Sequence, residues 1–399
     1  MIKNNILLQA AVIVMVAACS DPYLPKDDMD GECASVIMRM PSAEFDDVIT
    51  TRAEANVGSN ITFVWSETDV VGIFPETGSQ LYFSMADGAG KSSAVFDGGG
   101  WAMKKTASYY SYFPFYPDFY FDRTAIPMTF EGQVQHGNGD PAHADLGEYN
   151  YMVANGVYDE TSKTMEFSYK RLATLFRFMV PVAAGTYTSL TVSADSECIP
   201  SSGTFNSIEI DYAIDNPVYT DELTLELNDA VLESDGTLVG WMVLPPFNLS
   251  NQQLTISIID NKGAVTTSSV AGKNYQRTYV YNNAPGFSIY PQTATVSGKG
   301  ESTVLRIITD SDSNSYSVST DDDWLTLDSS PTSGAATITV TASENQGARR
   351  VGHVTVSETV TVNDTQVTLN NTMTIIQTIN GMNVDLGDWG DGEKVEGTV

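Results

Sequence analysis

The sequence is poor in positive charge. Among 399 residues, 20 Lys and Arg face 50 Asp and Glu, which gives a formal net charge of −30 at pH 7. Nucleic-acid binding needs clustered Lys and Arg to neutralise phosphate, so this balance argues against a nucleic-acid partner. The same sign of charge argues against anionic lipid headgroups. The excess of acid is compatible with solubility, calcium binding or neutral glycans, and selects none of them.

Histidine is also scarce, with three residues in the chain: His136, His143 and His353. The sequence has no nucleophile motif such as Gly-x-Ser-x-Gly. Paired carboxylates for glycoside hydrolysis stay an open alternative because acidic residues are everywhere, but nothing marks one pair. We therefore expect a protein that is not an enzyme, with no catalytic residues and no cofactor.

Cysteine is nearly absent, with Cys19, Cys33 and Cys198. The apolar run from Ile6 to Ala18 is too short to span a bilayer of roughly 30 Å. Its end, Val16-Ala17-Ala18 before Cys19, resembles a bacterial lipobox. This predicts a lipoprotein signal peptide over residues 1–18 and lipidation at Cys19, which would hold the chain on a membrane without a spanning helix. The alternative is an ordinary signal peptide followed by an incidental cysteine.

Residues 19–33 are polar, acidic and proline-bearing, which predicts a disordered tether. Lys26-Asp27-Asp28 resembles the tag that exports some lipoproteins to the outer face of the outer membrane, although these charges could also only solvate the tether. We expect a lipid-anchored protein of the cell outer membrane, exposed at the surface. An exported protein can pair Cys33 with Cys198, but no spacing signature supports that bridge.

Amphipathic helical stretches are also nearly missing; Lys170 to Phe176 is the one segment that fits either a helix or a strand. Alternating runs rich in β-branched and aromatic residues recur instead, for example Ile61–Trp65, Thr164–Tyr169, Leu223–Leu227, Leu254–Ile259 and Ala336–Thr341. Such period-two runs between Gly, Asn, Asp and Ser turns predict antiparallel strands. Many short strands of this kind predict an all-β protein built from β-sandwiches.

A series of degenerate motifs follows in order along residues 34–286: Trp65-x-x-x-Asp69-x-x-Gly72-Ile73-Phe74, Tyr110-Ser-Tyr-Phe-Pro-Phe115, Ile126-Pro127 with Gln133, Tyr149-Asn-Tyr-Met-Val-Ala154, Phe167-x-x-x-x-Leu172-x-x-Leu175-Phe176-x-Phe178, Gly240-Trp-Met-Val-Leu-Pro-Pro246, and Ala271-Gly-Lys-Asn-Tyr275 with Tyr279. This order resembles fimbrillin-family (type V pilin-like) lipoproteins. The last motif departs from the family, since Gln276-Arg277-Thr278 stands where a glycine is frequent.

The resemblance implies two transthyretin-like fimbrillin β-sandwich domains, which we place at residues 34–180 and 181–286. It also implies a role as a pilus shaft, tip or anchor subunit, or as a solitary surface adhesin.

The last third carries a second set of motifs: Ser315-Tyr-Ser-Val318, Asp323-Trp324-Leu-Thr326, Pro331-x-x-Gly334, Thr337-Ile-Thr-Val340, Asn345, Arg349-Arg350-x-Gly352 and Thr374-Ile-Ile-Gln377. These resemble a BACON domain, an immunoglobulin-like sandwich often attached to surface glycan-handling proteins. We place it at residues 287–380, with an insertion around Thr361 to Gln366 that lengthens its last hairpin. Residues 381–399 are predicted to be an acidic, Gly-rich tail.

The stretch SYYSYFPFYPDFYFD, Ser108 to Asp122, packs nine aromatic rings. The rings of Tyr110 to Phe115 are expected to be core, because the family motif includes them. The prolines that follow predict a stiff loop, so Tyr116, Phe119 and Tyr120 are candidates for stacking on sugar faces. Contact with another subunit is the alternative. Trp324 is predicted to be a core side chain.

Two loops could hold metals, and we expect neither to do so. The loop from His136 to Asp145 collects two histidines and two carboxylates, but lacks the tighter repeats usual for transition metals. The run Asp310-x-Asp312-x-Asn314 copies the opening of a calcium loop, but Ser315 stands where the sixth-position glycine belongs.

These features together predict a non-catalytic cell-surface lipoprotein adhesin that contacts host or dietary glycans, or mucin, through its β-sandwiches. The alternative is a tip or anchor subunit of a fimbria with other fimbrial subunits as partners. The resemblance then implies protease processing after Arg52, removal of a first strand around Val36–Met40, and addition of a donor strand. The alternative is that Arg52 is simply an exposed linker residue. A further alternative is an accessory protein of an outer-membrane glycan-uptake complex.

Overall fold

The computed structural model describes residues 35–45, 60–99, 103–104, 107–118, 122–139, 144, 146–208, 214–309, 311–362 and 365–380. In these ranges every element of regular secondary structure is a β-strand, which confirms the predicted all-β class. The segment that fitted either a helix or a strand forms β12 (Lys170–Arg171) and the start of β13 (Thr174–Val182). Within the same ranges, no helix is long and apolar enough to cross a membrane.

The N-terminal part is a closed ring of seven strands. Its order is β11-β1-β6-β5-β4-β7-β10, and β10 pairs back onto β11. The strands are β1 (Ser35–Arg39), β4 (Val70–Pro75), β5 (Leu81–Asp87), β6 (Ser93–Asp97), β7 (Tyr109–Phe113), β10 (Met152–Asp159) and β11 (Thr164–Ser168). Closure leaves these seven strands without a free sheet edge, apart from the short β12 that extends from β10.

Trp65 fills the interior of the ring. Its side chain is fully buried, and its ring meets those of Phe96, Phe113 and Tyr169 edge-on, with centroids 4.9–5.7 Å apart. The indole Nε1 donates a hydrogen bond to the carbonyl of Met38 on β1, at 3.2 Å. This geometry is favourable for aromatic pairs and also satisfies the buried N–H group.

The spacing of the first sequence motif now has a physical reading. Asp69 accepts a hydrogen bond from the backbone N–H of Ser66 at 2.7 Å, which holds the turn between Trp65 and β4. Burial raises the pKa of the Asp69 carboxyl above its usual range. Gly72 lies beneath the Tyr112 ring, where a Cβ atom would overlap that ring. Trp65 and Gly72 therefore serve packing, and Asp69 holds the turn between them.

The middle part contains three smaller sheets around the largest apolar cluster. One has the order β18-β13-β23-β2-β3, with β18 (Gly236–Leu244), β23 (Tyr279–Asn283), β2 (Ser42–Phe45) and β3 (Asn60–Thr62). The others are β16-β15-β8, with β16 (Asp215–Thr220), β15 (Ile199–Phe205) and β8 (Ile126–Thr129), and the pair β19 (Phe247–Asn248) and β22 (Asn274–Tyr275).

Two buried glutamines close the edge of β18. Gln135 accepts a hydrogen bond from the Trp241 N–H and donates one to the Val239 carbonyl, each at 2.8 Å. Gln133 accepts from the Val243 N–H and donates to the Val243 carbonyl, each at 2.7 Å. Side-chain amides therefore take the place of a neighbouring strand. This satisfies backbone groups along the edge, and the Val239 carbonyl also accepts a hydrogen bond from the Gly139 N–H at 3.2 Å.

One nine-stranded sheet runs from the middle part into the C-terminal part, in the order β28-β29-β26-β24-β21-β20-β14-β17-β9. Its strands are β9 (Gln133–His136), β14 (Gly185–Ser193), β17 (Glu222–Leu232), β20 (Gln253–Asp260), β21 (Val265–Ala271), β24 (Ser288–Tyr290), β26 (Ser302–Ile308), β28 (Leu325–Leu327) and β29 (Ala336–Ala342).

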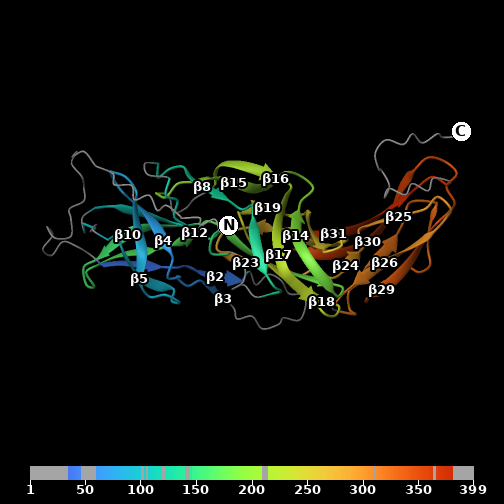
Figure 1. Cartoon of the computed structure of the whole chain (residues 1–399), viewed down its shortest axis with the longest axis horizontal. Helices are drawn as coiled ribbons and strands as arrows, with labels where there is room; N and C mark the ends of the chain where they lie inside the picture. Colours follow the sequence, from blue (N-terminus) through green and yellow to red (C-terminus); the bar gives the residue numbers. More distant parts are fainter. Residues whose placement is uncertain are drawn as a thin grey trace, which may run out of the picture.

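A four-stranded sheet, β25-β31-β30-β27, covers the C-terminal core. Its strands are β25 (Thr293–Val296), β27 (Ser317–Ser319), β30 (Arg350–Val362) and β31 (Thr365–Gln377). The thirteen-residue strands β30 and β31 pair along their full length, from Arg350–Gln377 to Val362–Thr365. Figure 1 shows the three parts following one another along the long axis, from β5 and β10 at one end to β25 and β29 at the other.

The predicted domain boundaries fall within continuous structure. The division between residues 180 and 181 lies inside β13, which spans Thr174–Val182. Across the division between residues 286 and 287, Thr267 of β21 pairs with Ile289 of β24, so the sheet continues. The division into domains therefore stays a prediction, because strands or strand pairs cross both predicted boundaries.

Candidate binding surfaces

Most of the predicted site residues lie outside the described residues. These are the lipidation site Cys19, the processing site Arg52, and the stacking candidates Phe119 and Tyr120. Cys33 lies outside as well, and Cys198 forms no disulfide within the described ranges, so their pairing stays a prediction. Tyr116 can be placed.

Tyr116 packs towards the core, whereas the predicted stacking role requires an exposed ring. Its side chain is half-buried against the large middle cluster, and its hydroxyl lies 3.1 Å from that of Tyr151. Its carbonyl accepts a hydrogen bond from the Gln80 amide at 3.0 Å. Burial raises the pKa of the Tyr116 hydroxyl. Sugar stacking by Tyr116, Phe119 and Tyr120 stays a prediction, with the first of these residues tied into the core.

The predicted core role of Tyr110 to Phe115 is confirmed in part, since Tyr112 and Phe113 are buried while Tyr110 and Phe115 are half-buried. Tyr109 and Phe113 point into the ring core, while Tyr112 joins the middle cluster from the opposite face of β7. Sequence reasoning missed Tyr82 on β5, which is 62% exposed beside the half-buried Phe115, with ring centroids 6.2 Å apart. The available signal in the sequence was its place between Leu81 and Phe83, which alternate with it and are buried.

Trp324 is half-buried against the C-terminal core, which it covers and does not fill. The Arg350 guanidinium lies 4.2 Å from the centre of its ring, and Gly352 leaves the space that the indole occupies. Arg350 is itself held by Gln377 at 2.7 Å and by the Ser343 carbonyl at 2.9 Å. These contacts occupy Trp324 in packing.

The candidate metal loops cannot be assembled from what is described. Asp140, His143, Asp145 and Asp310 lie outside the described residues. Among the residues that the structure describes, no group of three or more His, Cys, Asp or Glu side chains is placed to hold a metal ion.

The strand β1 occupies a slot in the ring between β6 and β11. It pairs parallel to β11, with Val36 opposite Met165, and antiparallel to β6, with Val36 opposite Phe96. Val36 and Met38 point into the ring core and are 3% and 0% exposed. The sequence interpretation placed the removable strand at these residues.

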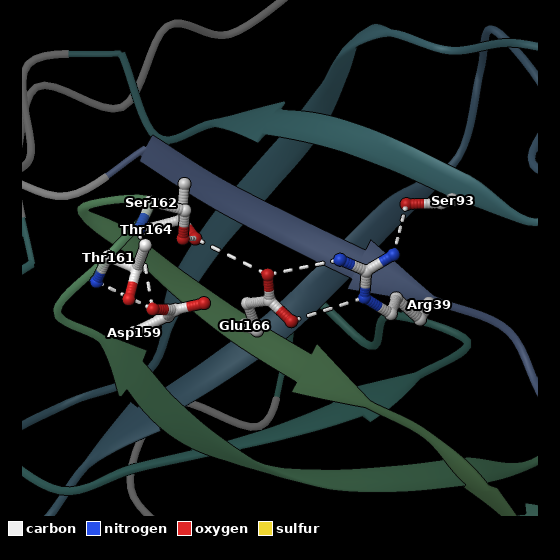
Figure 2. Close-up of polar contacts among 7 residues, drawn as sticks. All are labelled: Arg39, Ser93, Asp159, Thr161, Ser162, Thr164 and Glu166. Carbon is white, nitrogen blue, oxygen red and sulfur yellow. Dashed lines mark hydrogen bonds and ion pairs between the residues drawn. The ribbon is translucent and has the colours of Figure 1, made fainter.

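A polar network holds the end of β1 (Figure 2). Arg39 makes a two-pronged contact with the Glu166 carboxylate on β11, at 3.0 and 3.2 Å, and reaches Ser93 at 3.3 Å. Glu166 also accepts a hydrogen bond from the Thr164 hydroxyl at 3.4 Å. The Glu166 hydrogen bond raises the pKa of Arg39. Because the Arg39 side chain is 45% exposed, this ion pair is worth little next to the backbone pairing.

A polar cleft of about 370 Å³ lies where the C-terminal hairpin meets the middle part. One wall is the turn before β20, residues 251–253, with Asp195 beside it, and the other wall is the start of β31. We call this the junction cleft. Gln253 accepts a hydrogen bond from the Asn370 N–H at 3.0 Å and donates to the Asn370 carbonyl at 3.4 Å, so the two walls are bonded to each other.

A second cleft of about 500 Å³ lies between the turn before β18 and the strands β26 and β29. Its charged groups neutralise each other, since the Arg306 guanidinium lies 2.8 Å from the Asp235 carboxylate. The two clefts therefore differ in what their polar groups have left to offer a ligand.

Comparison with protein families confirms the sequence interpretation of the C-terminal region. Residues 312–377 match the BACON family model, described as "Putative binding domain, N-terminal". A comparison with curated proteins finds no match.

Solved structures of bacterial proteins are similar to the chain at low identity. A "putative cell adhesion protein" from Bacteroides uniformis has 14% identity and a TM-score of 0.41, with 65% of this chain and 94% of that one covered. One from Bacteroides ovatus has 13% identity and a TM-score of 0.40, covering 63% and 92%. The tip fimbrial protein Mfa3 from Porphyromonas gingivalis has 9% identity and a TM-score of 0.30, covering 62% and 94%. Likenesses of this degree do not extend to function.

Proposed function

We propose that the protein is a non-catalytic adhesin, held at the outer-membrane surface by lipid on Cys19, that binds glycans through its C-terminal part. The match of residues 312–377 to a family described as a binding domain carries this proposal. The polar junction cleft beside that region supplies a surface suited to such a role. The net charge of −30 favours neutral ligands over anionic ones.

A glycan array probed with the full chain tests the binding function. We expect retention on neutral glycans and on mucin, with no consumption of the bound sugar. An array without any bound glycan would contradict the proposal, and so would release of sugar products.

Metabolic labelling with radioactive palmitate tests the anchor separately. We expect the label on the full chain and its loss in Cys19→Ser, because the thiol takes the lipid. Label that persists in Cys19→Ser would contradict the assignment of Cys19.

A second candidate function, a tip or anchor subunit of a fimbria, is favoured by one observation. The five-residue β1 contributes two buried side chains to the ring, and its removal would open a slot between β6 and β11 for a donor strand. Surface-extracted protein that begins at Ala53 and forms an oligomer ladder would support this candidate. A lipidated, intact monomer would support the adhesin.

A further inference from the structure

The junction cleft has a fixed floor. The Gln253 side-chain amide hydrogen-bonds the backbone of Asn370. The Asn370 side chain accepts a hydrogen bond from the Ser357 hydroxyl at 2.7 Å. One residue further, Ser269 donates to Asn371 at 2.9 Å, and that asparagine is 2% exposed. These contacts join the C-terminal hairpin to the middle sheet, so the cleft walls do not need to be assembled when a ligand arrives.

The polar side chains at the rim of the cleft are free to bond a ligand. Asn251, Gln252, Gln366 and Asp195 are exposed, and within the described part of the chain their side chains make no hydrogen bond. Each amide offers two donors and a carbonyl acceptor. Asn251 has a positive φ of 65°, a conformation that asparagine tolerates, and it forms the corner of the turn on that wall. The rim therefore presents donors and acceptors in close alternation.

The charge of the lining selects a ligand class. It has one carboxylate, Asp195, and no Lys, Arg or His. A phosphate, sulfate or carboxylate ligand would meet no counter-charge and one like charge. The one apolar lining side chain, Val367, is 8% exposed, so the cleft offers no apolar anchor pocket to a peptide. Hydroxyl groups, which both donate and accept, match an amide rim.

The lengthened hairpin explains why the cleft exists. The insertion around residues 361–366 extends β30 and β31 beyond the C-terminal core. One face of the extension is buried through Val367 and Leu369, 8% and 3% exposed, which leaves Gln366 and Thr368 directed at the cleft. The cleft has a volume of about 370 Å³ and is open to solvent, so a small ligand can reach its rim.

We infer that the junction cleft binds a neutral carbohydrate, with Asn251, Gln252 and Gln366 hydrogen-bonding its hydroxyl groups and Asp195 accepting a further one. The inference rests on the proposed adhesin function and assigns that function to one site. It places the site between the C-terminal part and the middle part, so neither part holds the complete cleft.

The test uses the full chain, extracted in detergent, on an array of neutral, sialylated and sulfated oligosaccharides. The double variant Gln252→Ala/Gln366→Ala removes two rim amides, and we expect it to weaken binding to neutral glycans about tenfold. Gln346→Ala is the matched control, because this glutamine is exposed and lies outside the cleft. Equal thermal unfolding midpoints of the three proteins would show that the fold is intact.

The outcomes are distinct. Equal binding by the wild type and the double variant would overturn the cleft assignment and leave the adhesin proposal standing. Loss of binding in Phe119→Ala/Tyr120→Ala alone would place the site in the aromatic segment. Preference for sialylated or sulfated glycans would overturn the ligand class. No binding by the wild type would overturn the proposed function and, with it, the inference.

Discussion

The two ends of the molecule use their polar groups differently. In the N-terminal ring, seven strands satisfy one another's backbone, and the Arg39–Glu166 ion pair at the end of β1 is exposed. At the C-terminal junction, side-chain amides bond the hairpin to the middle sheet and leave a rim of unbonded amides. The proposed strand exchange would act on the ring, while the proposed sugar binding would use the junction.

The largest expected effect separates the two ends directly. Trp65→Ala removes the centre of the ring core and should cost about 3–5 kcal/mol of local stability. The variant leaves a cavity and loses the indole hydrogen bond to the Met38 carbonyl. Hydrogen exchange should accelerate in β1 and β11, with β30 and β31 unchanged. Tyr82→Ala, an exposed aromatic change on the same ring, is the control. Equal acceleration at both ends would show that they unfold as one unit.

The next effect concerns the edge of β18 in the middle part. Gln135→Ala leaves the Trp241 N–H buried without its partner, while the Val239 carbonyl keeps the hydrogen bond from the Gly139 N–H, and the change should cost roughly 1–3 kcal/mol. Denaturant midpoints would measure this cost, with Gln346→Ala as the exposed control. The opened β18 edge should also promote association, visible by light scattering. A change below about 0.5 kcal/mol would mean that the amide ladder does not protect this edge.

A pH effect is expected from Tyr187 in the middle part. Burial raises the pKa of its hydroxyl to about 12, and the hydroxyl donates to the Ala183 carbonyl at 2.5 Å. The unfolded chain releases this proton near pH 10, so the contribution to stability is complete below about pH 10 and is lost as the pH rises towards 12. Tyr187→Phe should flatten the fall in unfolding free energy over that window. Parallel pH profiles would contradict this.

The smallest effect tests what holds β1. Arg39→Ala should cost roughly 0.2–1 kcal/mol, because the ion pair is exposed, and a double-mutant cycle with Glu166→Ala should give a coupling of the same size. High salt should shrink the coupling further. A loss of several kcal/mol would mean that the ion pair, and not backbone pairing and the core, retains the strand.

The alternating pattern predicted much of the fold. It gave the all-β class and the inward rings of β7, because Tyr109, Tyr112 and Phe113 follow the expected faces. It could not give the role of Gln133 and Gln135, whose partners on β18 lie more than 100 residues away. Period-two alternation predicts that such glutamines are exposed. They are buried because their amides hydrogen-bond the edge of β18.

The junction cleft was missed for a related reason. Its walls come from segments more than 110 residues apart, and none of its amides belongs to a recognisable motif. The sequence did reveal the lengthened hairpin, but not the surface it reaches. The aromatic loop drew attention because rings stand out in a sequence, yet Tyr116 is bonded into the core.

Hydrogen–deuterium exchange of the full chain, with and without a saturating mixture of neutral oligosaccharides released from mucin, tests the contrast between the two ends most directly. We predict slower exchange at residues 251–253 and 366–370 when the sugars are present, and unchanged exchange at residues 35–39 and 164–168. Slower exchange confined to the ring, or to residues 107–118, would contradict the assignment of ligand binding to the junction.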